Sequence, residues 1–225
     1  MNKLVGMIYA VSMMVAVLAL VACSESFTDD RDGQSYSMVK IGEQVWMAEN
    51  LNFASVDAAG NSTSFCPEGD ARKCKEYGRL YTWEAAKSAC PAGWHLPAAE
   101  EFDAMLMAVM AADVRGAAMA QAANVTTVGR LLKSTSGWFK NGNGTDAVGF
   151  NALPAGYMSA AESTDGNSAV GKFDGIGGYA YFWSATTDAQ EPAFAQYLFL
   201  DFSSPVAGLN SFDKGSARSV RCVKN

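Results

Sequence analysis

The chain reads TWEAAKSACPAGWHLP at residues 82–97, and this stretch decides the fold. Its first half predicts a short helix, because Thr82 is a good N-cap residue and Pro91 and Gly93 would stop the helix. Pro97 then opens a longer helix, whose first turn is rich in acidic residues that favour the helix dipole. Apolar side chains recur there at helical spacing, namely at Phe102, Met105, Leu106, Val109 and Met110.

Strands flank this helical centre on both sides. Residues 36–41 and 44–47 alternate around a Gly-Glu turn and predict a β-hairpin. After residue 134 the chain is rich in Gly, Asn, Ser and aromatic residues, and residues 197–202 and 217–223 predict strands. A strand pair, two helices and a loop-rich β half indicate an α+β fold. Further helical turns are expected over residues 114–123 and 128–133.

The N-terminus carries the features of an export signal. A positive charge at Lys3 precedes a long apolar run that ends directly before Cys23. Small residues before that cysteine match the bacterial lipobox. We therefore expect a lipoprotein signal peptide over 1–22, a lipid on Cys23 within a polar tether over 23–31, and one domain over 32–225. An ordinary signal peptide, or an uncleaved anchor with an incidental cysteine, is the alternative.

The expected lipid places the protein on a membrane. Several acyl chains hold a protein firmly, since each buried methylene contributes about 0.8 kcal/mol. Ser24 follows the lipidated cysteine, and no Asp stands there to indicate retention at the inner membrane. The expected address is therefore the bacterial outer membrane. The chain has a formal net charge of -6 and no basic cluster, which argues against a nucleic-acid partner.

The remaining cysteines predict disulfides. With Cys23 lipidated, an exported chain keeps an even number of them, and these permit three pairings. We favour Cys66–Cys74, which closes a short polar loop, and Cys90–Cys222, which ties the end of an early helix to the last strand. A zinc site fits poorly, because the sequence has no Cys-x-x-Cys and a single histidine.

Seven blocks of sequence, in this order, resemble the Fibrobacter succinogenes major paralogous domain over roughly residues 32–224. The blocks are VWMAENL at 45–51, YGRLYTW at 77–83, CPAGWHLP at 90–97, LKSTSGW at 132–138, GFNALPAG at 149–156, YFWSAT at 181–186 and SVRCVK at 219–224.

This resemblance implies a C-type lectin-like fold, of the branch that includes formylglycine-generating enzymes. It implies two helices beside a small, twisted antiparallel sheet with long loops, stapled by disulfides. It also implies that the first and last elements meet, which suits Cys90–Cys222. The family is known mainly as surface or secreted lipoprotein domains, so the resemblance predicts fold and location more than activity.

No catalytic residue is expected. His95 lies between apolar neighbours, and general-base use would need a nucleophile or carboxylate held nearby, so we interpret it as a structural, hydrogen-bonded side chain. The sequence has no nucleophile elbow, phosphate loop or metalloprotease helix. A formylglycine-generating activity would need a reactive cysteine pair around a metal, whereas oxidised sulfurs cannot act as thiolate ligands.

No metal or other cofactor is expected either. Many C-type lectins bind sugar through calcium, which takes roughly six to eight oxygen ligands. The lectin signatures Glu-Pro-Asn and Trp-Asn-Asp are absent, and Glu191–Ala193 lacks the ligand amide. Asn141, Asn143 and Asp146 offer oxygens, but the glycines between them indicate a turn. Asp201 is interpreted as a solvated side chain.

The leading hypothesis is a noncatalytic cell-surface lipoprotein that binds a glycan or protein partner through a lectin-like domain. Aromatic residues of the C-terminal half would fill the core, and some would form an exposed binding face. An enzyme resembling formylglycine-generating enzymes and a structural envelope protein are the alternatives. The aromatic residues are Trp138, Phe150, Tyr157, Tyr179, Tyr181, Phe182, Trp183, Tyr197, Phe199 and Phe202.

Overall fold

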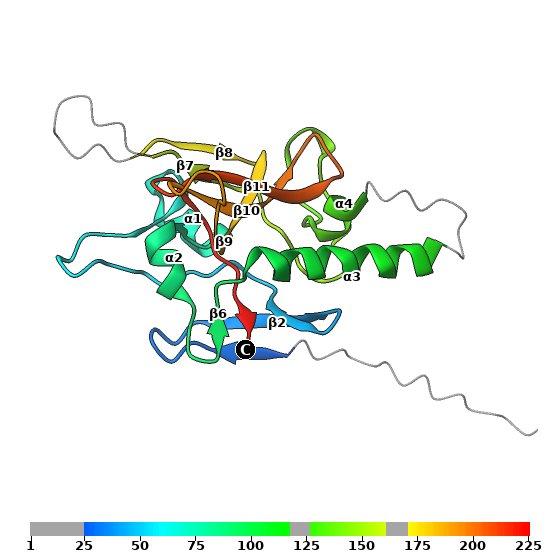
Figure 1. Ribbon diagram of the computed structural model, residues 1–225, viewed down its shortest axis with the longest axis horizontal. Coiled ribbons are helices and arrows are strands. Elements are labelled where there is room, and N and C mark those ends of the chain that lie inside the picture. The colour runs from blue at the N-terminus through cyan, green and yellow to red at the C-terminus, as the bar shows by residue number, and fades with distance from the viewer. Residues whose placement is uncertain (1–24, 118–126, 161–170) are drawn as a thin grey trace, which may run out of the picture.

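The computed structural model describes residues 25–117, 127–160 and 171–225, which build two β-sheets with helices between and beside them (Figure 1). The expected signal peptide, Cys23 and the end of the Ala-rich segment, 118–123, lie outside these residues. The helices are α1 Ala71–Tyr77, α2 Trp83–Ala89, α3 Ala99–Ala117 and α4 Val128–Leu132. The strands are β1 Ser26–Thr28, β2 Ser35–Ile41, β3 Gln44–Met47, β4 Ser64–Phe65, β5 Leu80–Thr82, β6 Trp94–His95, β7 Ala155–Met158, β8 Phe173–Ile176, β9 Tyr179–Thr187, β10 Phe194–Asp201, β11 Ala207–Asp213, β12 Ala217–Ser219 and β13 Val223–Lys224.

The helices follow the local signals of the sequence. Thr82 caps α2, as predicted, by accepting a hydrogen bond from the Ala85 amide. The longer α3 begins two residues after Pro97, and α4 lies within the predicted segment 128–133. No helix in the described ranges is both long and apolar enough to cross a membrane. The mixed content of helices and strands confirms the α+β class.

The smaller sheet joins the two ends of the domain. Its strand order is β1-β2-β3-β13-β6, and every pairing is antiparallel. The β2–β3 hairpin is the one predicted, and Gly42 enters its turn with a φ of 62°. The last strand lies inside the sheet, where Val223 pairs with Trp46 on one side and His95 on the other.

The larger sheet is bigger and less regular than expected. It has eight strands in the order β11-β10-β9-β7-β12-β5-β4, with β8 paired to β7. Both β7 and β12 run parallel to β9. The expectation of one small antiparallel sheet is therefore wrong. Short strands such as β7 contain glycines, which weaken the strand pattern in the sequence although long-range pairing holds them in place.

The predicted C-terminal strand, 217–223, is divided between the two sheets. β12 belongs to the larger sheet and β13 to the smaller one, and the buried segment between them crosses from one to the other. The carbonyls of Val220 and Cys222 accept hydrogen bonds from the amides of Leu51 and Met47 during this crossing. One alternating run of residues therefore supports both sheets.

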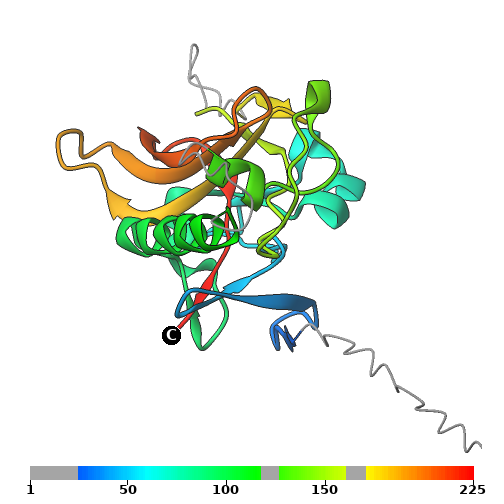
Figure 2. The ribbon, with the colours of Figure 1, turned by 90° about the vertical axis from the view of Figure 1, so that its right-hand side faces the viewer.

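The main core lies where α3 is held between the sheets (Figures 1 and 2). α3 contacts β9, β10 and β11 on one side and β2 on the other. Phe102 stacks on Trp46 with ring centroids 5.2 Å apart, and Phe150 meets the same Trp46 edge-on. Burial of these apolar rings is the main stabilising contribution of the helix.

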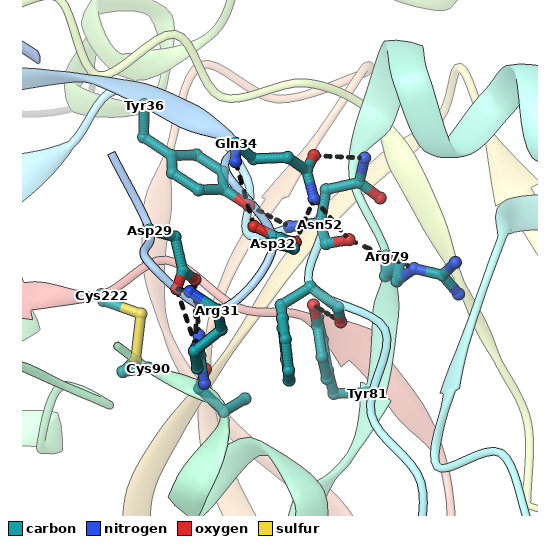
Figure 3. A network of polar contacts seen from close by, with 12 residues as sticks. Asp29, Arg31, Asp32, Gln34, Tyr36, Asn52, Arg79, Tyr81, Cys90 and Cys222 are labelled. Atoms are coloured by element: carbon teal, nitrogen blue, oxygen red, sulfur yellow. Dashed lines mark hydrogen bonds and ion pairs between the residues drawn. A yellow bond between two sulfur atoms is a disulfide. The ribbon is translucent and has the colours of Figure 1, made fainter. Parts of the chain in front are cut away.

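The expected tether over 23–31 is partly wrong, because its second half belongs to the folded domain. β1 pairs with β2, and Phe27 stacks on Trp94 with ring centroids 4.4 Å apart. Asp29 is buried and is held by Arg31, whose guanidinium also donates to the carbonyl of Ala89 (Figure 3). The polar composition of this segment hid its place in the fold, because Asp29 and Arg31 are bonded inside the domain.

Both disulfides have the pairing expected from the sequence. Cys66–Cys74 and Cys90–Cys222 span 8 and 132 positions of the chain. The segment inside the first bridge is more ordered than the predicted polar loop, because it forms a 3-10 turn and then the first turn of α1. Asp70 starts that helix by accepting a hydrogen bond from the Arg72 amide.

Candidate functional site

Four tyrosines share one face of the larger sheet, and we call them the tyrosine face. They are Tyr157 on β7, Tyr179 and Tyr181 on β9, and Tyr197 on β10. Because side chains alternate along a strand, the residues between them, such as Phe182 and Leu198, point the other way into the core around α3. Tyr157 and Tyr179 therefore lie on the outer face of this part of the sheet, whereas Tyr197 and Tyr181 pack in a second core cluster that includes Trp183.

The four rings form a continuous surface. Tyr179 and Tyr181 stack with centroids 5.3 Å apart. Tyr157 lies 5.6 Å from Tyr181, and Tyr197 meets Tyr181 edge-on at 5.1 Å. Tyr157, Tyr179 and Tyr181 are partly exposed, whereas Tyr197 is buried. Rings held in this way present aromatic area at little cost in conformational entropy.

Glycines make room for this surface. Gly175 on β8 has a φ of +76°, and a Cβ there would lie 2.5 Å from the Tyr179 ring. A Cβ at Gly177 would likewise clash with the ring of Phe139, which is 55% exposed. Phe139 in turn contacts Phe202, which contacts Tyr179. Gly175 and Gly177 therefore allow aromatic rings to pack directly against backbone.

The tyrosine hydroxyls are unengaged. Within the described residues, none of the four makes a hydrogen bond to another side chain or to the backbone, unlike Tyr36 and Tyr81, whose hydroxyls bond to the backbone. Burial raises the pKa of the Tyr181 and Tyr197 hydroxyls above the usual value. They stay protonated at physiological pH and are able to donate and accept hydrogen bonds.

A buried arginine lies among these rings. The guanidinium carbon of Arg218, on β12, is 4.1 Å from the ring centroid of Tyr197, 4.7 Å from that of Trp183 and 5.0 Å from that of Tyr181. Phe212 and Tyr157 complete the cage at 4.9 Å and 5.8 Å. Burial lowers the pKa of Arg218 to about 10, so the group is still a cation at neutral pH.

Sequence reasoning missed Arg218. A signal was present, because alternation along residues 217–223 places Arg218 on the same side as Val220 and Cys222, and therefore in a buried position. The aromatic residues were recognised as candidates for a binding face, but their grouping depends on pairing between β7, β9 and β10, which the sequence does not reveal.

His95, in contrast, is a partly buried, hydrogen-bonded side chain with a carboxylate beside it. Its Nε2 lies 2.9 Å from one carboxylate oxygen of Glu101, and its Nδ1 lies 2.6 Å from the side-chain oxygen of Asn225. Glu101 also accepts a hydrogen bond from the Ala98 amide at the start of α3. His95 therefore connects the beginning of that helix to the C-terminus.

The oxygen-rich segment 141–146 is irregular backbone between a 3-10 turn that ends at Asn141 and a turn at 147–148, so the predicted turn lies beside it. The side-chain oxygen of Asn143 accepts from the Trp138 amide, and that of Asp146 accepts from the Asn151 amide. Asp201 caps its own turn by accepting from the Ser203 amide. In the described part of the chain, no cluster of three or more His, Cys, Asp or Glu side chains is placed to hold a metal ion.

A separate groove of about 530 Å³ runs between residues 53–57 and α2. Phe53 forms part of its wall and is fixed by Arg31, 3.9 Å above its ring, and by the Tyr81 hydroxyl, which donates to its carbonyl (Figure 3). The acidic groups of the groove are already paired, Asp57 with Asn61 and Glu84 with Lys87. The tyrosine face, with its unengaged hydroxyls, is therefore the better candidate site.

Comparison with known proteins gives one match. A family model described as the Fibrobacter succinogenes major domain matches residues 39–224. No curated protein and no solved structure matches the sequence.

Proposed function

The chain belongs to the Fibrobacter succinogenes major domain family, and from this premise we propose that it is a noncatalytic, lipid-anchored protein of the bacterial outer membrane that binds a glycan through the tyrosine face. The single observation that carries the proposal is the partly exposed, mutually packed set of Tyr157, Tyr179 and Tyr181. Such rings offer an apolar surface to the C–H face of a sugar, with hydroxyls at the edge for its polar groups.

The proposal includes a C-type lectin-like fold. Two features support it beyond the α+β class. The early hairpin β2–β3 and the final strand β13 share one sheet, so the first and last elements meet. Cys90–Cys222 ties the end of α2 to that final strand.

The proposed location follows from sequence and redox chemistry together. The apolar run before Cys23 supports export and lipidation. Both cysteine pairs of the folded domain are disulfides, which suit an oxidising compartment outside the cytoplasm. The same disulfides disfavour the alternative of a formylglycine-generating activity, because that chemistry needs free thiolates.

A protein partner is the second proposal, and exposed phenylalanines favour it. Phe139 and Phe212, at either end of the aromatic surface, are 55% and 43% exposed. Exposed aromatic side chains of this kind are common anchors in protein interfaces. A structural role in the envelope would need neither the phenylalanines nor the tyrosine face.

A glycan array probed with the full chain in detergent tests the leading proposal. We expect binding to a restricted set of oligosaccharides and at least tenfold weaker binding by Tyr179→Ala. Val56→Ala is the matched control, because Val56 is a 63% exposed apolar side chain at the separate groove, and it should bind like the wild type. Binding to no glycan, or an equal loss in both variants, would overturn the proposal.

A further inference from the structure

Arg218 carries a charge that the fold leaves without a partner. The side chain is 1% exposed, and its Nε and Nη1 atoms are buried with no hydrogen-bond acceptor. Within the described residues, no carboxylate forms an ion pair with it. Leaving buried donors of a charged group unsatisfied costs several kcal/mol in a typical protein, so this arrangement requires an explanation.

The neighbouring Arg221 is a buried arginine that the same fold does bond. Its Nε also lacks an acceptor, but its Nη groups donate to the carbonyls of Phe150 and Asn151 and to the side-chain oxygen of Asn50. Arg221 therefore fixes the loop that contains Phe150. Arg218 lies only three positions earlier, yet its guanidinium donates to no described residue and contacts rings instead.

We propose that Arg218 recognises a carboxylate on the glycan, so that the tyrosine face binds oligosaccharides that contain an acidic sugar. This inference rests on the proposed glycan-binding function and names the ligand class for the same site. The carboxylate would accept hydrogen bonds from the guanidinium, and the sugar ring would stack on Tyr179 and Tyr181.

The chemistry of the guanidinium favours a carboxylate. The rings of Tyr197, Trp183 and Tyr181 lie 4.1–5.0 Å from the guanidinium carbon, and among them Nε and Nη1 have no acceptor. A planar carboxylate matches the planar guanidinium through two parallel hydrogen bonds, whereas a tetrahedral phosphate is bulkier.

The route to Arg218 lies beside Phe212. This side chain comes from β11, the edge strand of the larger sheet, and it is the most exposed ring of the cage. A ligand that reaches Arg218 would therefore have to displace the Phe212 ring. The net charge of -6 would repel a polyanion, so the favoured ligand is a glycan with an isolated acidic sugar.

The test compares acidic and neutral sugars on the same array. The acidic probes are oligosaccharides with a single glucuronic, galacturonic or sialic acid, and the neutral ones are cello-, xylo- and manno-oligosaccharides. We expect the bound probes to be acidic. The best of them is then titrated against its methyl ester, which has the same skeleton without the charge. The wild type should bind the acid at least tenfold more tightly than the ester.

Variants identify the residue responsible. Arg218→Met keeps an apolar stem among the rings and should bind acid and ester equally, with affinity for the ester within twofold of the wild type. Lys172→Met removes an exposed cation that directly precedes β8 in this chain. This variant should keep the preference for the acid over the ester. Arg218→Lys should keep part of it.

The outcomes separate the two proposals. Equal binding of acid and ester by the wild type, or an unchanged preference in Arg218→Met, overturns the role of Arg218 and leaves glycan binding intact. The absence of any glycan ligand overturns the proposed function itself. Should Arg218→Met not fold, the wild-type comparison of acid with ester and the Arg218→Lys variant still decide the question.

Discussion

Both carboxylate oxygens of Asp29 accept hydrogen bonds from the guanidinium of Arg31, with Nη2–Oδ2 and Nε–Oδ1 distances of 2.7 Å and 2.9 Å. The same guanidinium donates to the carbonyl of Ala89, directly before Cys90 (Figure 3). Three parts of the chain that are distant in sequence are thereby joined at one point: the segment after β1, the end of α2 and the long disulfide.

Asp29→Asn should lower the free energy of unfolding by about 1–2 kcal/mol at neutral pH, since it weakens a buried charged hydrogen bond. The Arg31 hydrogen bond holds the pKa of Asp29 below its usual 3.8. A lowered pKa in the folded state contributes stability that is present above the unfolded pKa and is lost as the pH falls through the folded value. In urea unfolding at pH 7, 5 and 3, the difference from wild type should therefore shrink only in the most acidic series.

Asp70→Asn is the control for that experiment. Asp70 makes the equivalent pair with Arg72, at 2.7 Å, but Arg72 is 90% exposed and exposed pairs contribute little. Asn also replaces Asp well as an N-cap. A much smaller change is expected, and a difference for Asp29→Asn that stays constant down to pH 3 would contradict the assignment.

The two disulfides should differ in their contributions to stability. The chain-entropy model assigns about 5 kcal/mol to a loop the size of that closed by Cys90–Cys222 and about 2.5 kcal/mol to one the size of that closed by Cys66–Cys74. Guanidinium unfolding of the two double Cys→Ala variants, under non-reducing conditions, measures both. Equal losses would show that native-state strain or residual structure, rather than loop length, governs the difference.

The start of α3 is capped from another element. The Thr186 hydroxyl, on β9, accepts a hydrogen bond from the Ala99 amide at 3.0 Å. Thr186→Val keeps the shape and removes the acceptor, so we expect a loss of about 1 kcal/mol. Hydrogen exchange should localise the effect to the first turn of α3. Uniformly faster exchange across the domain would argue against a capping role.

Gly175→Ala tests how the tyrosine face is positioned. Because the new methyl group would lie 2.5 Å from the Tyr179 ring at a backbone φ of +76°, the ring must move. Gly175→Ala leaves every aromatic residue unchanged, yet we expect it to bind the glycan more weakly. Titration measures the affinity, and circular dichroism checks that the variant is folded. Unchanged affinity in a folded variant would mean that the position of Tyr179 is unimportant.

Cys23→Ala should abolish incorporation of a palmitate analogue in cells. The expected lipid is attached to that thiol, so removal of the sulfur leaves no acceptor. In-gel fluorescence of the labelled protein measures this directly. Equal labelling of both versions would defeat the assignment of Cys23.

The helix bounds could be predicted because they depend on residues close by in the sequence. Thr82, Pro91 and Pro97 act within one turn of their own position, so the helix bounds near residues 82–99 follow from the sequence. The hairpin at 36–47 and the short Cys66–Cys74 bridge follow from the same kind of reasoning, whereas Cys90–Cys222 spans 132 positions and was predicted as a tie between an early helix and the last strand. The α+β class follows from the order of these elements.

Features that depend on long-range strand pairing could not be predicted from the sequence. Residues 217–223 alternate like one strand, but they are divided because their two ends pair with strands of different sheets. Asp29 and Arg31 look like a solvated tether until the Ala89 carbonyl is placed beside them. The alternation around Arg218 indicates burial but not its surroundings, because the rings around it come from four other strands.

The early start of β1 has a consequence for a lipidated molecule. β1 begins at Ser26, so a fully extended chain would separate it from Cys23 by no more than about 10 Å. A lipidated domain on so short a tether cannot move far from the bilayer. A ligand would therefore have to come within about one domain diameter of the membrane surface. Such a protein would sample the sugars of its own envelope before those of the surrounding medium.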